Sequence, residues 1–175
     1  MEAARVAGHA RWLEGRLFEV VGGWVQAEPH PRAKAFWAVR SRRHADHAAG
    51  WHDRQPRVAH LDPDTLAVAA SPEVAALFDA LAALDGTAPR LQAVGGVLLP
   101  ALVAAYRARI AVAHPLADGA TVRWATRVAA DEEEAAVVAV GLAPDPGGST
   151  SPGPELRIPA GGPGAMLGLA DAQKS

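Results

Sequence analysis

Two histidines, His44 and His47, stand three residues apart in a segment with helical periodicity. Imidazoles at positions i and i+3 lie on one face of a helix, where both can bind the same metal ion. The same face carries Trp37 and Trp51, large aromatic residues that favour burial. Because a buried polar group without a partner costs free energy, the interior around the histidines must supply hydrogen-bonding groups or a metal ion.

Carboxylates fall on or beside the apolar faces of two further predicted helices. Glu14 adjoins the apolar stripe of the first helix, and Asp131 falls in the middle of the stripe of the last helix. Glu134 follows one turn later at the edge of that stripe, whereas Glu132 and Glu133 are predicted to point away from it. The stripe of the last helix is defined by Trp124, Val128, Ala135, Val138 and Leu142.

The fourth predicted helix carries two more polar residues, Tyr106 and Arg109, within its apolar stripe. Burial of a charged group costs several kcal/mol unless the group is paired or bound to a metal. The sequence therefore predicts one polar layer inside the protein, with Tyr106 and Arg109 as candidate catalytic residues. The candidate metal ligands of this layer are Glu14, His44, His47, Asp131 and Glu134, and Arg40 lies one turn from His44.

Two interpretations of this polar layer are open on the sequence alone. In the first, the histidines and carboxylates bind a metal ion. In the second, they form a hydrogen-bonded and ion-paired network with Arg40 or Arg109, and the tyrosine is an ordinary core residue. A cationic Arg109 near the centre would repel a metal ion, which favours the second interpretation. Under both interpretations His44, His47 and Asp131 are expected to lie in one interior cluster.

Proline, glycine and capping residues divide the chain into five predicted helices. Prolines close the first and second helices, and Gly86 is a C-terminal stop for the third. Thr87 is predicted to cap the fourth helix, in which Pro100 should introduce a kink. The lengths favour a bundle of four main helices plus a shorter one. The predicted helices span about 3–26, 32–54, 71–85, 87–113 and 118–142.

The composition indicates an all-α protein without disulfides. Alanine dominates the hydrophobic residues, and isoleucine and threonine are scarce, which favours helix over strand. The absence of cysteine excludes disulfides and thiolate metal sites. A net charge of −2 argues against a general nucleic-acid-binding surface. The sequence has no signal-peptide pattern and no apolar run of about 18 residues, so we expect a cytoplasmic protein without a membrane span.

The last part of the chain differs in composition from the rest. Residues 144–164 are rich in glycine and proline, and such a stretch cannot bury enough apolar area to offset its conformational entropy. The sequence therefore predicts a helical-bundle domain over residues 1–143 and a mostly disordered tail over residues 144–175. Within the tail, Met166, Leu167 and Leu169 could form one short apolar turn. Deletion of the tail is expected to leave the melting temperature nearly unchanged.

The order of the polar residues resembles that of the ferritin-like superfamily. That superfamily places a carboxylate on one helix and a Glu-x-x-His pair on the next, and then repeats the scheme. Glu14 matches the lone carboxylate, and the segments 44–47 (His-Ala-Asp-His) and 131–134 (Asp-Glu-Glu-Glu) stand where the two pairs would be. The pattern is also similar to small ferritin-like proteins of high-GC bacteria, and the resemblance covers residues 3–142.

The resemblance implies a ferritin-like bundle with an iron or manganese centre. Such a centre activates dioxygen for the oxidation or hydroxylation of a small substrate. The chain departs from the pattern, because His44 replaces the first Glu, Glu134 replaces the second His, and Tyr106 and Arg109 stand where a further carboxylate is expected. The alternative is a metal-free descendant of the fold that binds a small ligand or acts as a protein-interaction module.

Overall fold

The computed structural model describes residues 2–56, 62–114, 116–143 and 156–169, and all regular secondary structure within these ranges is helical. The all-α class that the sequence predicts is thereby confirmed. The elements are α1 (Glu2–Ala27), α2 (Pro31–Arg54), α3 (Pro72–Ala82), α4 (Thr87–Leu91), α5 (Leu99–Ala111), α6 (Gly119–Leu142) and α7 (Gly162–Ala165), with a 3₁₀ turn at Pro63–Leu66 and a π-helical segment at Gln92–Leu98.

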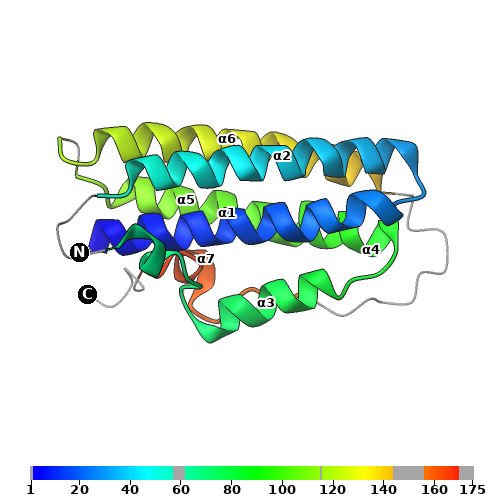
Figure 1. The fold of residues 1–175 in the computed structure, drawn as a ribbon, viewed down its shortest axis with the longest axis horizontal. Helices are drawn as coiled ribbons and strands as arrows, with labels where there is room; N and C mark the ends of the chain where they lie inside the picture. Colours follow the sequence, from blue (N-terminus) through cyan, green and yellow to red (C-terminus); the bar gives the residue numbers. More distant parts are fainter. Residues whose placement is uncertain (1, 57–61, 115, 144–155, 170–175) are drawn as a thin grey trace.

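The long helices α1, α2, α5 and α6 run side by side and form a bundle (Figure 1). α2 folds back against α1, and α6 packs against α5. α2 and α6 also meet each other, whereas α3 lies apart from them, against α1 (Figure 1). The bundle therefore consists of two helical hairpins whose interior faces enclose the core.

The apolar stripe predicted for the first helix is confirmed. All of its members are buried, and Glu14 beside them is fully inaccessible to solvent. On α2, Trp37 and Trp51 are likewise fully buried, and both histidines lie on the same buried face. The polar groups of this face therefore lie in the core of the bundle. The buried stripe of α1 comprises Val6, Ala10, Leu13, Leu17, Val20, Val21 and Trp24.

A buried carboxylate holds the turn between α1 and α2. The side chain of Glu28 accepts hydrogen bonds from the His30 amide, the Trp37 indole and the Thr87 hydroxyl group. The turn is thereby tied to the beginning of α4. The prediction that Thr87 caps the fourth helix is wrong, because Gly86 occupies the capping position with a φ of 84° and the Thr87 hydroxyl group bonds to Glu28 instead.

The stretch from Thr87 to Ala111 is one continuous helix with an irregular middle. A π-helical segment, Gln92–Leu98, ends just before Pro100. Proline has no amide hydrogen, and its ring would clash with a carbonyl group of the preceding turn in a regular α-helix, so an irregular turn is expected before it. Among the described residues, only this stretch is long and apolar enough to span a membrane, and 61% of its apolar window is buried inside the bundle. Burial of this kind is typical of a core helix.

Part of the segment predicted to be a disordered tail packs on the bundle. Met166 and Leu167 are fully buried, and Leu156 is nearly so. The short helix α7 contacts α5, so the apolar turn predicted around Met166 is present and has a partner. The predicted tail is thus too long, because three apolar side chains find a surface to cover. The remaining parts of that tail, 144–155 and 170–175, lie outside the described residues.

Candidate metal centre

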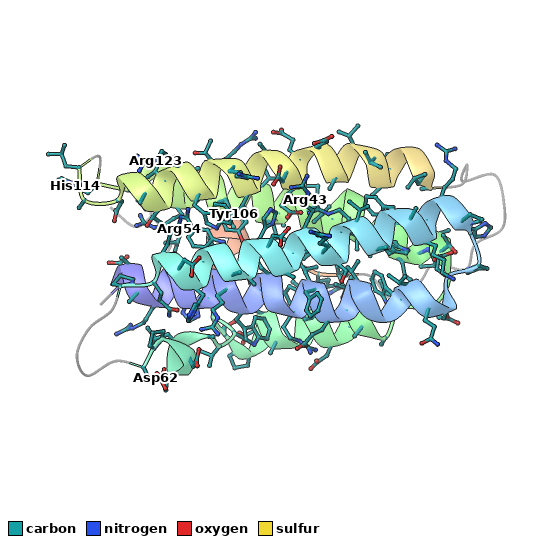
Figure 2. The ribbon with its side chains drawn as sticks, turned by 45° about the horizontal axis from the view of Figure 1, so that its top comes forward. Arg43, Arg54, Asp62, Tyr106, His114 and Arg123 are labelled. Atoms are coloured by element: carbon teal, nitrogen blue, oxygen red, sulfur yellow. The ribbon has the colours of Figure 1, made fainter. Side chains whose placement is uncertain are left out.

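Glu14 is the carboxylate that α1 contributes to the site. Its Oε2 atom accepts a hydrogen bond from His44 Nδ1 over 2.7 Å, and its Oε1 atom accepts one from the Tyr106 hydroxyl group over 2.5 Å. All three side chains are buried. Tyr106 extends from α5 into the bundle (Figure 2). The tyrosine therefore holds one oxygen of Glu14 and leaves the other directed towards the histidines.

His47 bridges two acidic residues of α6. Its Nε2 atom donates a hydrogen bond to the carboxylate of Asp131 over 3.1 Å. Its Nδ1 atom lies 3.1 Å from Glu132 Oε1 and 3.4 Å from Glu14 Oε2. In the neutral imidazole, a proton on Nε2 leaves the lone pair on Nδ1, so the contact with Asp131 prepares Nδ1 to bind a metal ion.

Glu132 closes the site from α6. One of its oxygens, Oε2, forms an ion pair with Arg40 Nη2 over 2.5 Å. The other, Oε1, lies 3.5 Å from His44 Nδ1. Glu132 is fully buried and Arg40 is 6% exposed, so the ion pair lies in the interior. The pairing balances one negative charge of the site and fixes the orientation of the carboxylate.

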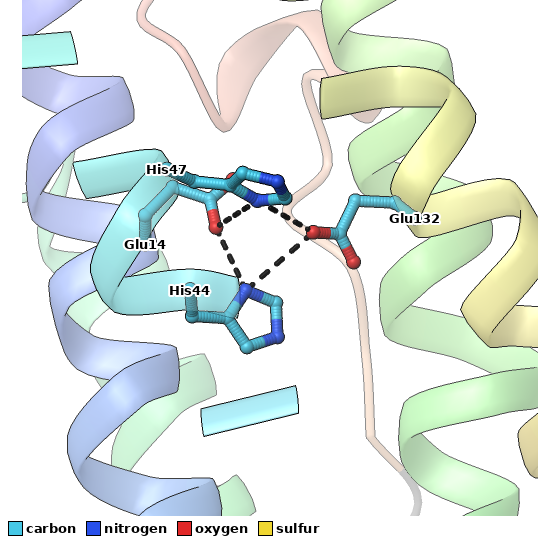
Figure 3. Close-up of side chains that lie close together, drawn as sticks. All are labelled: Glu14, His44, His47 and Glu132. Atoms are coloured by element: carbon cyan, nitrogen blue, oxygen red, sulfur yellow. Dashed lines mark hydrogen bonds and ion pairs between the residues drawn. The ribbon is translucent and has the colours of Figure 1, made fainter. Parts of the chain in front are cut away.

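Four donor atoms converge on one point between α1, α2 and α6. They belong to Glu14, His44, His47 and Glu132, and all lie within 4.8 Å of one another (Figure 3). Neighbouring ligands about 2.1 Å from one metal ion lie about 3.0 Å apart in octahedral geometry and about 3.4 Å apart in tetrahedral geometry. Of the four nitrogen–oxygen separations, three are 3.1, 3.4 and 3.5 Å, and the fourth is 2.7 Å. The cluster therefore has the dimensions of a site for one metal ion.

Two buried atoms of the cluster have ion-pair contacts but no hydrogen bond of regular geometry. His47 Nδ1 and Glu132 Oε1 are buried and have no hydrogen-bond partner among the described residues, although only 3.1 Å separates them. The two atoms form an ion-pair contact with each other, and His47 Nδ1 forms a second one with Glu14 (Figure 3). A buried group that lacks a regular hydrogen bond recovers only part of its desolvation cost, and a metal ion at this position would recover the rest.

The electrostatics of the metal-free site favour charged groups. Burial by itself would lower the pKa of His47, but the neighbouring carboxylates of Glu132 and Glu14 outweigh it and raise the pKa to about 10. Burial would raise the pKa of Glu14, yet His44 and His47 hold it well below its usual range. Burial and the negative charge of Glu14 raise the pKa of Tyr106, whose hydroxyl group therefore keeps its proton.

The predicted cluster of His44, His47 and Asp131 is confirmed, with Asp131 at its edge. The prediction that Glu132 points away from the interior is wrong, because this residue is fully buried and takes the position expected for Asp131 or Glu134. Glu134 is exposed and lies outside the group of converging donors. α6 buries alanines where larger residues were expected, and Val138 of the predicted stripe is 44% exposed. The whole helix is thus rotated relative to the prediction.

The two candidate catalytic residues have different positions. Tyr106 contacts the site through Glu14 and stacks on Trp51 with a ring distance of 5.7 Å. Arg109 is buried and forms an ion pair with Asp118 over 3.0 Å, and within the described residues it forms no ion pair with the four donors. The expected repulsion between Arg109 and a central cation is therefore weakened by the Asp118 carboxylate. The buried ion pair of the site involves Arg40 instead.

The raised pKa of His47 predicts that the metal-free protein loses stability as the pH rises. In the unfolded chain His47 has an ordinary pKa of about 6.5, whereas in the folded protein its pKa is about 10. The stabilisation is therefore complete below about pH 6.5 and is lost as the pH rises towards about 10. Circular dichroism should show a melting temperature that falls across this interval.

The matched control for this prediction is another histidine of α2. His47→Gln should remove the contribution of the site to the decline, whereas His52→Gln changes an exposed residue and should retain it. An equally steep decline in both variants would show that a group other than His47 is responsible.

The fold and the site together define a helical-bundle protein with a buried cluster of two histidines and two glutamates that could hold a metal ion. No protein-family model, curated protein or solved structure gives a significant match to the chain.

Proposed function

We propose that this protein binds one iron or manganese ion in the interior of its helical bundle. The ligands are Glu14 of α1, His44 and His47 of α2, and Glu132 of α6. The observation that carries the proposal is the convergence of four buried donor atoms, two of which have no hydrogen-bond partner in the described part of the chain. The bundle itself would then be a divergent member of the ferritin-like superfamily.

The donor set narrows the class of metal. Imidazole nitrogens and carboxylate oxygens together suit iron, manganese and zinc. Among these we choose iron or manganese, because the resemblance to ferritin-like proteins implies them. Both metals accept up to six ligands, whereas the described chain offers four, so two positions are open to small molecules. A divalent ion would balance the charges of the two glutamates, and the positive charge of Arg40 is balanced by the negative charge of Asp131 beside the site.

Three residues outside the ligand set position the ligands. Asp131 accepts the hydrogen bond of His47 Nε2 and fixes the ring so that Nδ1 faces the centre. Arg40 holds the distal oxygen of Glu132, and the Tyr106 hydroxyl group holds the distal oxygen of Glu14. Each carboxylate therefore presents a single oxygen to the centre, which favours monodentate binding.

We further propose that the centre serves an oxidase or hydroxylase reaction on a small molecule. A bound iron or manganese ion would supply dioxygen activation, as the resemblance to ferritin-like proteins implies. The protein would contribute exclusion of water, because all four ligands are at most 2% exposed. Tyr106 would remain protonated and would serve as a hydrogen-bond donor to Glu14.

The test is the metal content and the stability of the purified protein. Elemental analysis of protein prepared without chelator should find one iron or manganese ion per chain. After metal removal, a free concentration one hundred times the Kd should stabilise the protein by about 2.7 kcal/mol. If neither metal binds and neither raises the melting temperature, the cluster is a metal-free polar network and the proposal is overturned.

A further inference from the structure

A groove between α2 and α6 lies directly beside the metal centre. Its volume is about 470 Å³, which is within the range of small-molecule sites, roughly 300–1,000 Å³. Its apolar wall includes Phe36 and Val39 of α2 and Val138 and Leu142 of α6. Val39 is 59% and Val138 44% exposed, so the wall leaves apolar surface uncovered. The groove thus offers a surface for the apolar part of a ligand.

The inner end of the groove is formed by residues that contact the metal ligands. Arg40 and Asp131 both line the groove. Arg40 forms the ion pair with Glu132, and Asp131 accepts the hydrogen bond of His47. Arg40 is 6% exposed, and its Nε atom has no hydrogen-bond partner among the described residues. A molecule in the groove would therefore lie one side chain away from the proposed centre.

The charges of the groove differ between its two ends. Four charged residues line the inner end: Arg40 and Arg43 are positive, Asp131 and Glu134 are negative, and their formal charges cancel. Arg43 lies between α2 and α6 in Figure 2. At the outer end Arg32 is the charged lining residue, and it is exposed. An anionic group is therefore favoured beside Arg32, eight residues or about 12 Å along α2 from Arg40.

We propose that the groove binds a medium-chain carboxylate, with its carboxylate group beside Arg32 and its apolar chain directed towards the metal centre. The chain would cover the apolar side chains of Phe36, Val39 and Val138. The inference that this carboxylate is a substrate rests on the proposed function. The inference that the groove binds it depends only on the residues of the groove.

The binding test uses decanoate as the probe, with titration calorimetry as the measurement. Wild-type protein should bind decanoate and should not bind acetate, which lacks the chain. Val138→Asp places a charge against the chain and should weaken decanoate binding about tenfold or more. The matched control is Val137→Asp, because Val137 is the adjacent residue of α6, is 72% exposed and does not line the groove.

The second test reverses the charge of the residue that is proposed to bind the carboxylate group. Arg32→Glu should weaken decanoate binding about fivefold, the size expected when an exposed ion pair of up to about 1 kcal/mol is lost. Lys34→Glu, at an exposed position two residues away, should change binding less than about twofold. Decyltrimethylammonium, with the same chain and the opposite charge, should bind more weakly than decanoate.

The orientation test uses protein loaded with Mn(II). The paramagnetic ion should broaden the proton NMR signals of decanoate most at the methyl end and least beside the carboxylate. Equal affinity of Val138→Asp and wild type, or stronger broadening beside the carboxylate, would overturn the proposal. A dimer that Val138→Asp dissociates, without decanoate binding, would instead assign the groove to a second copy of this chain. If Mn(II) fails to bind while the variants behave as expected, only the proposed metal function is lost.

Discussion

Glu132→Gln is expected to lower the affinity for Mn(II) or Fe(II) more than about hundredfold, since loss of a residue that merely orients a ligand already costs about 10–100-fold. The substitution replaces a ligand oxygen that lies 3.1 Å from His47 Nδ1 and removes the negative charge that attracts the ion. Glu134→Gln is the matched control, because Glu134 lies two residues away on α6 and is exposed. Its affinity should stay within about twofold of wild type.

Competition with a fluorescent chelator measures this difference directly. Because Glu132→Gln also leaves the buried Arg40 without its ion-pair partner, the helical content of each variant has to be checked by circular dichroism. His47→Ala is a second test, since it removes a ligand from α2 and leaves the Arg40 ion pair intact. Folded protein of both variants that binds metal as tightly as wild type would exclude the proposed centre.

Leu167→Ala is expected to lower the free energy of unfolding by about 2–5 kcal/mol, the usual cost of truncating a fully buried leucine. Leu167 and its neighbour Met166 are both fully buried in the core. Leu116→Ala is the control, because Leu116 is 92% exposed and its truncation should change the free energy by no more than about 0.5 kcal/mol.

Urea denaturation of the metal-free protein measures the free energy of unfolding of wild type, Leu167→Ala and Leu116→Ala. An unfolding free energy of Leu167→Ala equal to that of wild type would show that the segment from 156 to 169 contributes nothing to the fold. The expected loss also revises the deletion experiment, since removal of residues 144–175 would expose the surface that Leu167 and Met166 cover and should lower the melting temperature.

The all-α class and most helix positions could be predicted because they depend on local properties. The predicted segments 3–26 and 32–54 correspond to Glu2–Ala27 and Pro31–Arg54, with ends set by prolines. The buried face of α2 was also predictable, because Trp37 and Trp51 are large and mark the side that faces the core. Both histidines lie on that side, so their burial followed from the sequence alone.

The rotation of α6 was decided by the tertiary structure. Asp131 and Glu132 both lie three or four residues from Val128 and from Ala135, so helical periodicity places either one on the buried side. The larger residues Trp124 and Val138 suggested the face of Asp131. The buried positions of α6 are instead mostly alanines. The helix packs closely against its neighbours, since a Cβ atom added at Gly95 would lie 2.6 Å from Ala139 Cβ.

The burial of the tail and the ion pairs of the site were likewise decided by tertiary packing. The glycine- and proline-rich composition of residues 144–164 predicted a segment without regular structure. The burial of Met166 and Leu167 could not be predicted in this way, because the surface that they cover exists only in the folded bundle. The sequence placed a carboxylate, two histidines and an arginine in the interior. The tertiary structure decided which acidic residue of α6 completes the cluster and that Arg40, not Arg109, pairs with it. These contacts join residues about 90 positions apart, so they depend on how the helices rotate and pack against each other.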